Sequence, residues 1–327
     1  MPDFQKTKPL PVIIDTDPGV DDALALLLAL RSRELDVRAL CTVCGNVDVH
    51  RATRNLCTVL NLLPGPYPPL AQGAKHPLQR TLCTAGHIHG TDGLGGRTTS
   101  QPVPQDPKEK VLPLSRRDAA DEILHHIAGS SEALTLIALG PLTNIALALQ
   151  RDRQLVHRIQ ELIVMGGAYT QAGNITPAAE FNIFVDPEAA QEVFTSGLPI
   201  TAVGLDVTRQ VRLDQRTRED WIGSSPSPMH KAIQKWTDYS LQAMQHLEGT
   251  ASMPLHDPLA VMVAMHPDLV QTQAMHVQVE TQGSATLGMT LADRRPLLES
   301  RKERPNLQVC TQVDKRRSLD LFLEGLR

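Results

Sequence analysis

Aromatic residues and long apolar runs are both scarce in this chain of 327 residues. Phe, Trp and Tyr together make up 3% of it. The longest apolar run, residues 23–30, is well short of the roughly 20 residues that cross a bilayer. Residues 1–11 contain no apolar segment of the signal-peptide kind. We therefore expect a cytoplasmic protein with no membrane partner.

Neither sign of charge is in excess. The chain has 32 Lys and Arg against 36 Asp and Glu, which gives a formal net charge of -4. A surface that binds nucleic acid needs a concentrated positive field, whereas the basic residues here are scattered along the chain. These properties predict a small-molecule partner and no nucleic acid.

Cysteine is too rare, and odd in number, for a disulfide framework. The chain has five cysteines, which suits reduced thiols. Cys41 and Cys44 are spaced as C-x-x-C, but they adjoin an apolar run and no second pair follows. We expect both to be small core residues rather than a zinc or redox site.

Short apolar runs alternate with helical patterns, which predicts an α/β fold with a mostly parallel central sheet flanked by helices. Expected strands cover 12–14, 37–43, 133–139, 162–165 and 200–205. Expected helices cover 21–33, 51–63, 118–128, 143–150 and 187–195. From about 207 to 264 the pattern is helical and more polar, and short runs such as 285–290 follow from 277. We expect an N-terminal tail, 1–11, and one large domain, 12–327.

An unusual acidic cluster follows the first expected strand. Asp15, Asp17, Asp21 and Asp22 fall within eight residues, with Pro18-Gly19 as a turn between the pairs. Ligands of open parallel sheets bind at this end of the strands. Either pair alone would be an ordinary capping device. Four carboxylates that converge would repel one another unless a cation lies between them, and oxygen ligands favour Ca²⁺ or Mg²⁺ over zinc.

Two further regions are weaker candidates when taken alone. His256 and Asp257 lie in a short turn before an apolar helical run, where an Asp before Pro is also a common structural feature. Residues 84–107 are rich in Gly, Pro, Thr and His and show no periodicity. They predict a long loop of the kind that often closes over a site.

The segment 15–23, DTDPGVDDA, resembles the N-terminal signature of the inosine-uridine-preferring nucleoside hydrolases. Further segments resemble that family in the family's order, so that the resemblance covers about residues 12–314. These segments are 43–46, 85–90, 140–144, 165–167, 179–183, 186–188, 256–258 and 287–290. The combination is specific, whereas any single segment would be weak evidence.

The resemblance implies the nucleoside hydrolase fold and a calcium-dependent enzyme that cleaves ribonucleosides with water to ribose and free base. It implies that the metal ligands are Asp17, Asp22, Asp257 and the backbone carbonyl of Leu139. Asp17 would also be the base that activates water, with Asp15 supporting the site from behind. The family also implies a homo-oligomer, either a dimer or a tetramer.

The resemblance also assigns the substrate contacts. His256 matches the family's proposed acid for the departing base, and His89 matches a second histidine near it. The ribose hydroxyls would bind residues at five positions, beside an apolar wall of Met165 and Phe181. These five are Asp21, Asn46, Asn174, Glu180 and Asn182. For Asn174 an ordinary turn role remains open, since Gly-Asn is common in loops.

The sequence differs from the family at the positions that contact the nucleobase. Met244 and Glu248 fall near positions where non-specific members place Tyr and Arg. Trp221 and Trp236 do not fall at the loop position that the purine-specific members use for stacking. The sequence therefore leaves the base preference open, and both tryptophans are equally compatible with a core or subunit-interface role.

Two other functions are compatible with parts of the sequence. Asp15 and Asp17 have the spacing of the haloacid-dehalogenase-like phosphatases, which use Mg²⁺. Gly19 stands where those enzymes carry Thr or Val, and residues 15–30 offer no Lys or Arg for a phosphate. A catalytically silent ribonucleoside-binding protein is the other alternative.

Overall fold

The computed structural model describes residues 8–96, 112–224, 226–296 and 303–327. Its centre is an eight-stranded sheet in which all neighbouring strands run parallel except the last pair. In spatial order the strands are β3 (Leu70–Gln72), β2 (Leu35–Thr42), β1 (Leu10–Thr16), β4 (Leu134–Ala138), β5 (Ile159–Met165), β6 (Ile200–Val203), β12 (Leu307–Val313) and β9 (Val270–Met275). The expected α/β fold with a mostly parallel sheet is confirmed.

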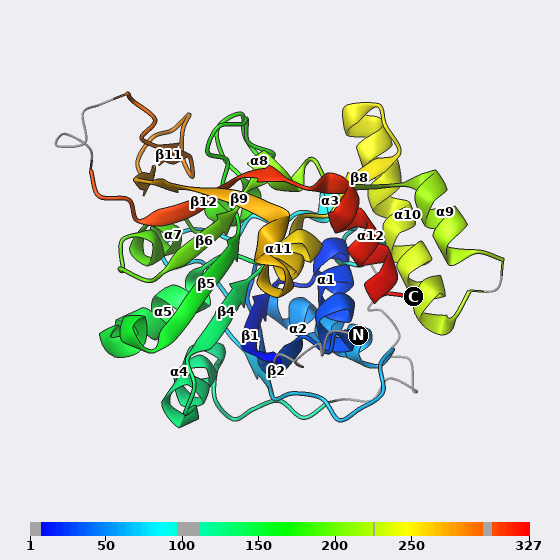
Figure 1. The fold of residues 1–327 in the computed structure, drawn as a ribbon, viewed down its shortest axis with the longest axis horizontal. Helices are drawn as coiled ribbons and strands as arrows, with labels where there is room; N and C mark the ends of the chain where they lie inside the picture. Colours follow the sequence, from blue (N-terminus) through cyan, green and yellow to red (C-terminus); the bar gives the residue numbers. More distant parts are fainter. Residues whose placement is uncertain (1–7, 97–111, 225, 297–302) are drawn as a thin grey trace, which may run out of the picture.

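Helices cover both faces of this sheet (Figure 1). One face carries α1 (Val20–Arg31), α2 (Val49–Leu60) and α11 (His256–Met265), with α12 (Lys315–Gly325) packed on α1 and α11. The other carries α4 (Ala119–Gly129), α5 (Thr143–Arg151) and α7 (Pro187–Phe194). Side chains alternate along β1. Val12 and Ile14 pack in the core between the sheet and α1, α2 and α11, and Ile13 packs in the core between the sheet and α4, α5 and α7. This is the two-residue period of a strand buried on both faces.

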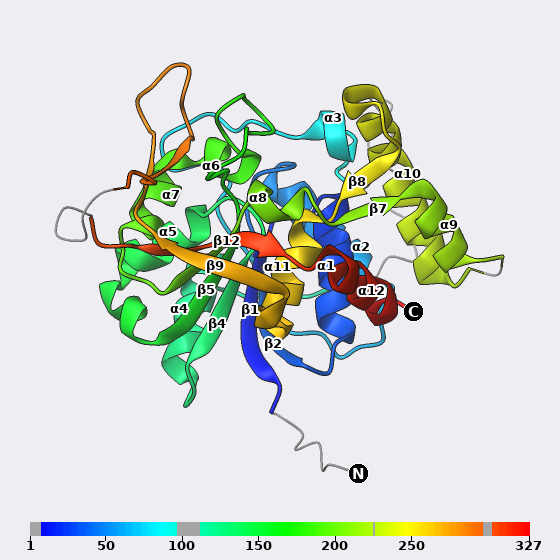
Figure 2. The same ribbon diagram turned by 45° about the horizontal axis from the view of Figure 1, so that its top comes forward.

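A smaller group of elements stands beside the sheet. It contains α9 (Gln215–Ile222), α10 (Pro228–Glu248) and the antiparallel pair β7 (Arg212–Asp214) and β8 (Ser252–Pro254). Figure 2 shows α10 next to the short helix α3 (Gly86–His89), with which it is in contact. The remaining elements are α6 (Phe181–Val185), α8 (Leu205–Thr208), β10 (Val277–Val279), β11 (Thr290–Ala292) and two 3₁₀ turns, Arg153–His157 and Pro267–Leu269.

The structure differs from the sequence-based expectations in several places. β1 begins at Leu10, which pairs with Leu35, so the structured part of the chain starts before residue 12. The short run 285–290 is mostly a turn, which covers residues 284–288, and β11 begins only at its last residue, Thr290. The expected loop 84–107 contains α3, and its residues from 97 on lie outside the described part of the chain. The strands β7 and β8 were not expected, because three residues give no readable period.

Cys41 and Cys44 are buried free thiols, as expected for core residues. Within the described residues, no helix combines the length and the apolar character that a bilayer crossing requires.

Candidate active site

The site begins where four neighbouring strands end. Asp17 follows β1, Asn46 follows β2, Leu139 follows β4 and Met165 is the last residue of β5. The carboxyl ends of parallel strands meet at one edge of a sheet, which is why these residues converge. The Asn182 amide ties two of the ends together: Nδ2 donates to the carbonyl oxygens of Leu139 at 2.7 Å and Met165 at 3.1 Å.

The start of α1 fixes the carboxylate of Asp22. Its Oδ1 accepts a hydrogen bond from Thr16 Oγ1 at 2.5 Å. Its Oδ2 accepts from the Gly19 N–H at 2.9 Å and from Asn46 Nδ2 at 3.1 Å. An acid in the first turn of a helix is favoured by the helix dipole. The local sequence thus fixes the position of this carboxylate before any ligand binds.

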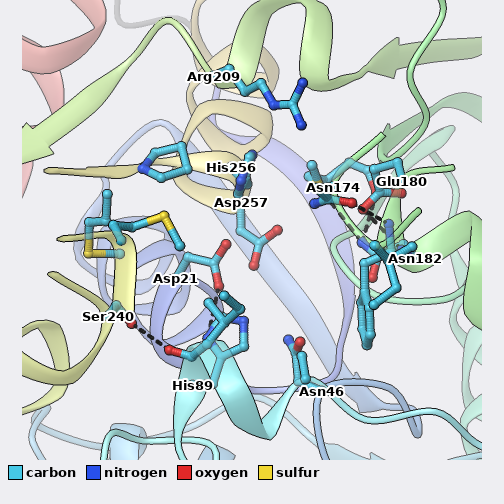
Figure 3. Close-up of a pocket in the computed structure, with 18 of the residues that line it drawn as sticks. Asp21, Asn46, His89, Asn174, Glu180, Asn182, Arg209, Ser240, His256 and Asp257 are labelled. Atoms are coloured by element: carbon cyan, nitrogen blue, oxygen red, sulfur yellow. Dashed lines mark hydrogen bonds and ion pairs between the residues drawn. The ribbon is translucent and has the colours of Figure 1, made fainter. Parts of the chain in front are cut away.

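Three carboxylates from two helices meet at the floor of a cavity. Oxygens of Asp21 and Asp22 at the start of α1 and of Asp257 at the start of α11 all lie within 4.8 Å of one another. Figure 3 shows Asp21 and Asp257 directed toward the same space. Burial raises the pKa of Asp21 to about 8, and burial together with the neighbouring acids raises the pKa of Asp257 well above its usual range.

Asp17 lies near these three carboxylates and is completely buried. Its Oδ2 accepts from the Asn46 N–H at 2.6 Å, and its Oδ1 has no hydrogen-bond partner among the described residues. Burial, followed by the charge of Asp22, raises the pKa of Asp17. A Cβ atom at Gly45 or Gly140 would collide with the Asp17 carboxylate, so both glycines are needed for the close approach of the backbone.

The carboxylate oxygens at the bottom of the cavity suit a divalent cation that prefers oxygen ligands. Asp17 Oδ1 and Asp21 Oδ1 are buried oxygens with no hydrogen bond to any described residue. A cation would satisfy such oxygens and remove the repulsion among the acids. Asp21, expected as a ribose contact, is one of the three carboxylates whose oxygens lie within 4.8 Å of one another. Asp17, expected as a metal ligand, is not one of these three.

Asp15 supports the site from the side away from the cavity. Its Oδ1 accepts from Asn144 Nδ2 at 2.7 Å, and its Oδ2 lacks a partner among the described residues. Burial raises the pKa of Asp15 to about 7. Asn144 also donates to the Thr42 carbonyl at 3.0 Å and accepts from the Ala74 N–H at 2.8 Å. It therefore joins the ends of β1, β2 and β3.

The cavity above the carboxylates has a volume of about 330 Å³. One wall is built around Glu180, whose carboxylate accepts from the backbone N–H groups of Gly167, Asn182 and Ile183 at 3.0 to 3.2 Å. Asn174 belongs to the same wall, because its Oδ1 accepts from the Phe181 N–H at 2.9 Å (Figure 3). Burial raises the pKa of Glu180.

Three histidines, His87, His89 and His256, line the cavity, and two of them are held by hydrogen bonds to described residues. His89 Nδ1 accepts from the Val20 N–H at 3.1 Å and lies 3.8 Å from Asp21 Oδ1. His256 Nδ1 lies 2.7 Å from Thr208 Oγ1. Burial lowers the pKa of His89 to about 4 and that of His256 to about 3.

The part of the cavity nearest α3 and α10 has both apolar and polar lining: Ile88, Met244, Leu247 and Met253 are the apolar side chains, and His87, His89, Ser240 and Glu248 are the polar ones. Glu248, also in the lining, is paired with Arg212 at 2.7 Å.

Neither tryptophan lines the cavity. Trp236 belongs to the core, and Trp221 donates from Nε1 to the Leu323 carbonyl at 3.0 Å.

All the expected substrate contacts line one cavity, and three further residues were missed by the sequence. Arg209 lines the cavity and donates to the carbonyls of Ala172 at 2.8 Å and Gly173 at 2.6 Å. Ser240 lines it and donates to the Ile88 carbonyl at 3.2 Å. Thr208 lies behind His256. Each is an isolated position in a helical segment, where no motif marks it.

The sequence matches the family model of the inosine-uridine preferring nucleoside hydrolases over residues 12–320. The chain belongs to this family. Curated relatives named pyrimidine-specific ribonucleoside hydrolase RihA are 39% identical over 321 residues in Salmonella schwarzengrund and 40% over 319 in Photobacterium profundum. Both matches cover 97% of this chain and 98% of the relative.

Solved structures of the family have the same fold. A plant nucleoside hydrolase, PpNRh1, superposes with a TM-score of 0.87 at 33% identity, covering 97% of this chain and 99% of the other. A purine-preferring ribonucleoside hydrolase from Gardnerella vaginalis gives a TM-score of 0.85 at 32% identity, covering 97% and 98%. As a member of this family the chain is an N-glycosyl hydrolase of ribonucleosides. The matches do not favour the phosphatase or the silent binding protein.

Proposed function

We propose that this chain is a calcium-assisted ribonucleoside hydrolase in which Asp17 activates the attacking water. The observation that carries the proposal is the meeting of Asp21, Asp22 and Asp257 at the cavity, with the buried Asp17 carboxylate close to Asp22. No Lys or Arg is hydrogen-bonded or ion-paired to any of these four carboxylates within the described residues. Capping acids do not need this arrangement, whereas a cation site does.

Calcium would be held by Asp17, Asp22, Asp257 and the carbonyl oxygen of Leu139. When bound, it supplies positive charge that neutralises the acids, orients water and grips a sugar diol. Calcium lowers the pKa of water much less than zinc does, so a protein base is still required.

Asp17 is suited to be that base. A carboxylate whose pKa lies above its usual range accepts a proton more readily near neutral pH. In the reaction, the water oxygen forms a bond to C1′ and one water proton passes to Asp17. The bond between C1′ and the nucleobase nitrogen breaks, and its electron pair leaves with the nucleobase. Positive charge develops on C1′ and the ring oxygen, and the acidic cavity stabilises it more than the neutral substrate.

The ribose would be held by side chains around the cavity wall. We assign its hydroxyls to Asp21, Asn46, Asn174, Glu180 and Asn182, with Met165 and Phe181 as apolar contacts. All seven line the cavity. The backbone hydrogen bonds that fix the Glu180 and Asn174 side chains support this assignment, since a site held in place in advance loses less entropy on binding.

His256 and His89 would lie toward the departing base. Because burial lowers the pKa of His256 to about 3, the ring is a neutral hydrogen-bond donor to the base rather than an imidazolium. The base preference follows from neither the apolar lining nor the relatives, whose names include pyrimidine-specific and purine-preferring enzymes.

We also place the chain in the cytoplasm, as a homo-oligomer that serves nucleoside salvage and catabolism. The oligomeric state and the role in salvage and catabolism rest on the family resemblance. The mass in solution against 35.8 kDa for one chain tests the oligomeric state.

The deciding experiment measures free base released from inosine, adenosine, guanosine, uridine and cytidine, with deoxyribonucleosides as controls. Asp17→Asn should lower kcat by about 10²- to 10⁴-fold, the range for loss of a general base, while the protein remains folded. Asp268→Asn, an exposed acid paired with Arg317, is the matched control and should retain activity. EGTA should inactivate the wild type and calcium should restore it.

Turnover retained by Asp17→Asn would remove Asp17 as the base. Phosphate released from a nucleotide, with Mg²⁺ required and calcium without effect, would point instead to the phosphatase.

A further inference from the structure

Thr208 is a completely buried residue at the end of α8, directly behind His256. Its Oγ1 lies 2.7 Å from His256 Nδ1. Among the described residues this is the hydroxyl's one hydrogen-bond partner, since the hydroxyl does not bond back to the preceding turn of its own helix. The ring nitrogen on the other side, Nε2, makes no hydrogen bond to a described residue, and His256 lines the cavity.

The direction of this hydrogen bond follows from the burial of Thr208. If His256 Nδ1 carried the proton, the hydroxyl would accept and its own hydrogen would be buried without an acceptor, which is a costly arrangement. If the hydroxyl donates, both groups are satisfied. Nδ1 is then the acceptor, and the ring proton lies on Nε2.

The helix that carries Thr208 is held rigidly on the cavity wall. Asp206 accepts from the backbone N–H groups of Tyr169 at 2.9 Å and Thr170 at 2.7 Å. Arg209 donates to the carbonyls of Ala172 and Gly173 on the same loop. The hydroxyl therefore has a fixed position against the imidazole, as a positioning group requires.

We propose that Thr208 is a positioning residue that holds His256 as the Nε2–H tautomer, with that N–H directed at the departing base. The inference rests on the proposed function and extends it to a residue that does not touch the substrate. As the C1′–nitrogen bond breaks and its electron pair moves to the base, the Nε2–H donates a hydrogen bond to the developing anion. The ring keeps its proton, and the free base takes one from solvent.

The test compares two leaving groups in three proteins. The substrates are uridine, whose base leaves poorly without hydrogen bonding, and 4-nitrophenyl β-D-ribofuranoside, whose leaving group is stable as an anion. The proteins are the wild type, Thr208→Val, which has the same shape without the hydroxyl, and Thr208→Ser, which keeps the hydroxyl.

Thr208→Val should lower kcat on uridine by about 10- to 100-fold, a range taken from the loss of the outer partner of metal-bound histidines. Its kcat on the nitrophenyl riboside should stay within about 2-fold of the wild type, because that leaving group needs no donor. Thr208→Ser should restore activity on uridine. Equal losses on both substrates would mean a structural role only, and no loss on uridine would also overturn the proposal.

A second measurement does not depend on activity or on the variants. The ¹⁵N shifts of the His256 ring in the wild type, assigned by their absence in His256→Gln, should show an unprotonated Nδ1 and a protonated Nε2. A proton on Nδ1 would overturn the inference. Failure of the wild type to cleave either riboside would instead remove the proposed function, so the two failures are distinguishable.

Discussion

At the scale of single residues, the acids of the site differ from capping acids in what surrounds them. Asp48 caps α2 from an exposed position and accepts from two backbone N–H groups. Asp17 and Asp15 are buried, and each leaves one oxygen without a hydrogen bond to a described residue. Buried carboxylate oxygens are costly when unpartnered. The structure tolerates them where a ligand can satisfy them, so they mark a site rather than a helix end.

Asn144 provides a test of this support at one residue. Asn144→Ala should lower the free energy of unfolding by about 3 kcal/mol, because it leaves Asp15 Oδ1 and the Ala74 N–H without partners and removes one of the two donors to the Thr42 carbonyl. Urea unfolding measures the change. Asn61→Ala is a matched control, since the Asn61 side-chain nitrogen has no partner among the described residues and its loss should cost little. Similar losses in both variants would contradict this account.

At the scale of elements, helix starts do most of the positioning. The first turns of α1 and α11 carry Asp22 and Asp257, and the two helices pack side by side on one face of the sheet (Figure 1). The start of α6 is capped by Glu180, which also faces the cavity. A carboxylate that caps the start of a helix accepts hydrogen bonds from backbone N–H groups, and it can still present an oxygen to a ligand.

Asp186 caps the start of α7, but unlike Glu180 it does not line the cavity. It accepts from the Ala189 N–H at 3.1 Å, the Leu78 N–H at 2.8 Å and Thr143 Oγ1 at 2.7 Å, and so joins three segments. Asp186→Ala should lower the free energy of unfolding by about 3 kcal/mol, because three donors lose a buried acceptor. Asp48→Ala, which removes an exposed cap, should cost about 1 kcal/mol.

Chemical denaturation of the two variants measures both changes. Equal losses would show that Asp186 contributes as a simple helix cap and not as the link between the segments.

At the scale of the whole molecule, the site depends on chain segments far apart in sequence. The acids of α1 and the acid of α11 are separated by more than half the chain and meet only because the two helices lie together. A ligand that binds these acids ties the two segments to each other. Such a ligand stabilises the folded state, since the unfolded chain does not present the site.

Calcium should therefore raise the Tm of the wild type. At free calcium about 100-fold above Kd the free energy of unfolding should rise by about 2.7 kcal/mol. Thermal unfolding with calcium and with EGTA measures the shift. Asp257→Asn should lose most of the shift, and Asp268→Asn, whose carboxylate is exposed, should keep it. A shift that survives in Asp257→Asn would place the cation elsewhere.

The sequence by itself determined the layered architecture and the location of the acidic cluster. Strand and helix periods are local properties, so the parallel core strands and their helices could be read from patterns such as 133–139 and 187–195. β9 and β12 were not read, because β9 is an exposed edge strand with Gln271 and Gln273 and gives no apolar run. The turn between Asp17 and Asp21 placed four acids at a strand end.

Only the tertiary structure decided which groups meet. It brought Asp21 into the closest carboxylate group, put Asn144 behind Asp15 and placed Thr208 against His256. Family resemblance had joined Asp257 to the site, but spacing could not, because no local rule relates residues more than 200 positions apart. Distances between distant segments are set by how helices pack on the sheet, and that packing is a property of the whole fold.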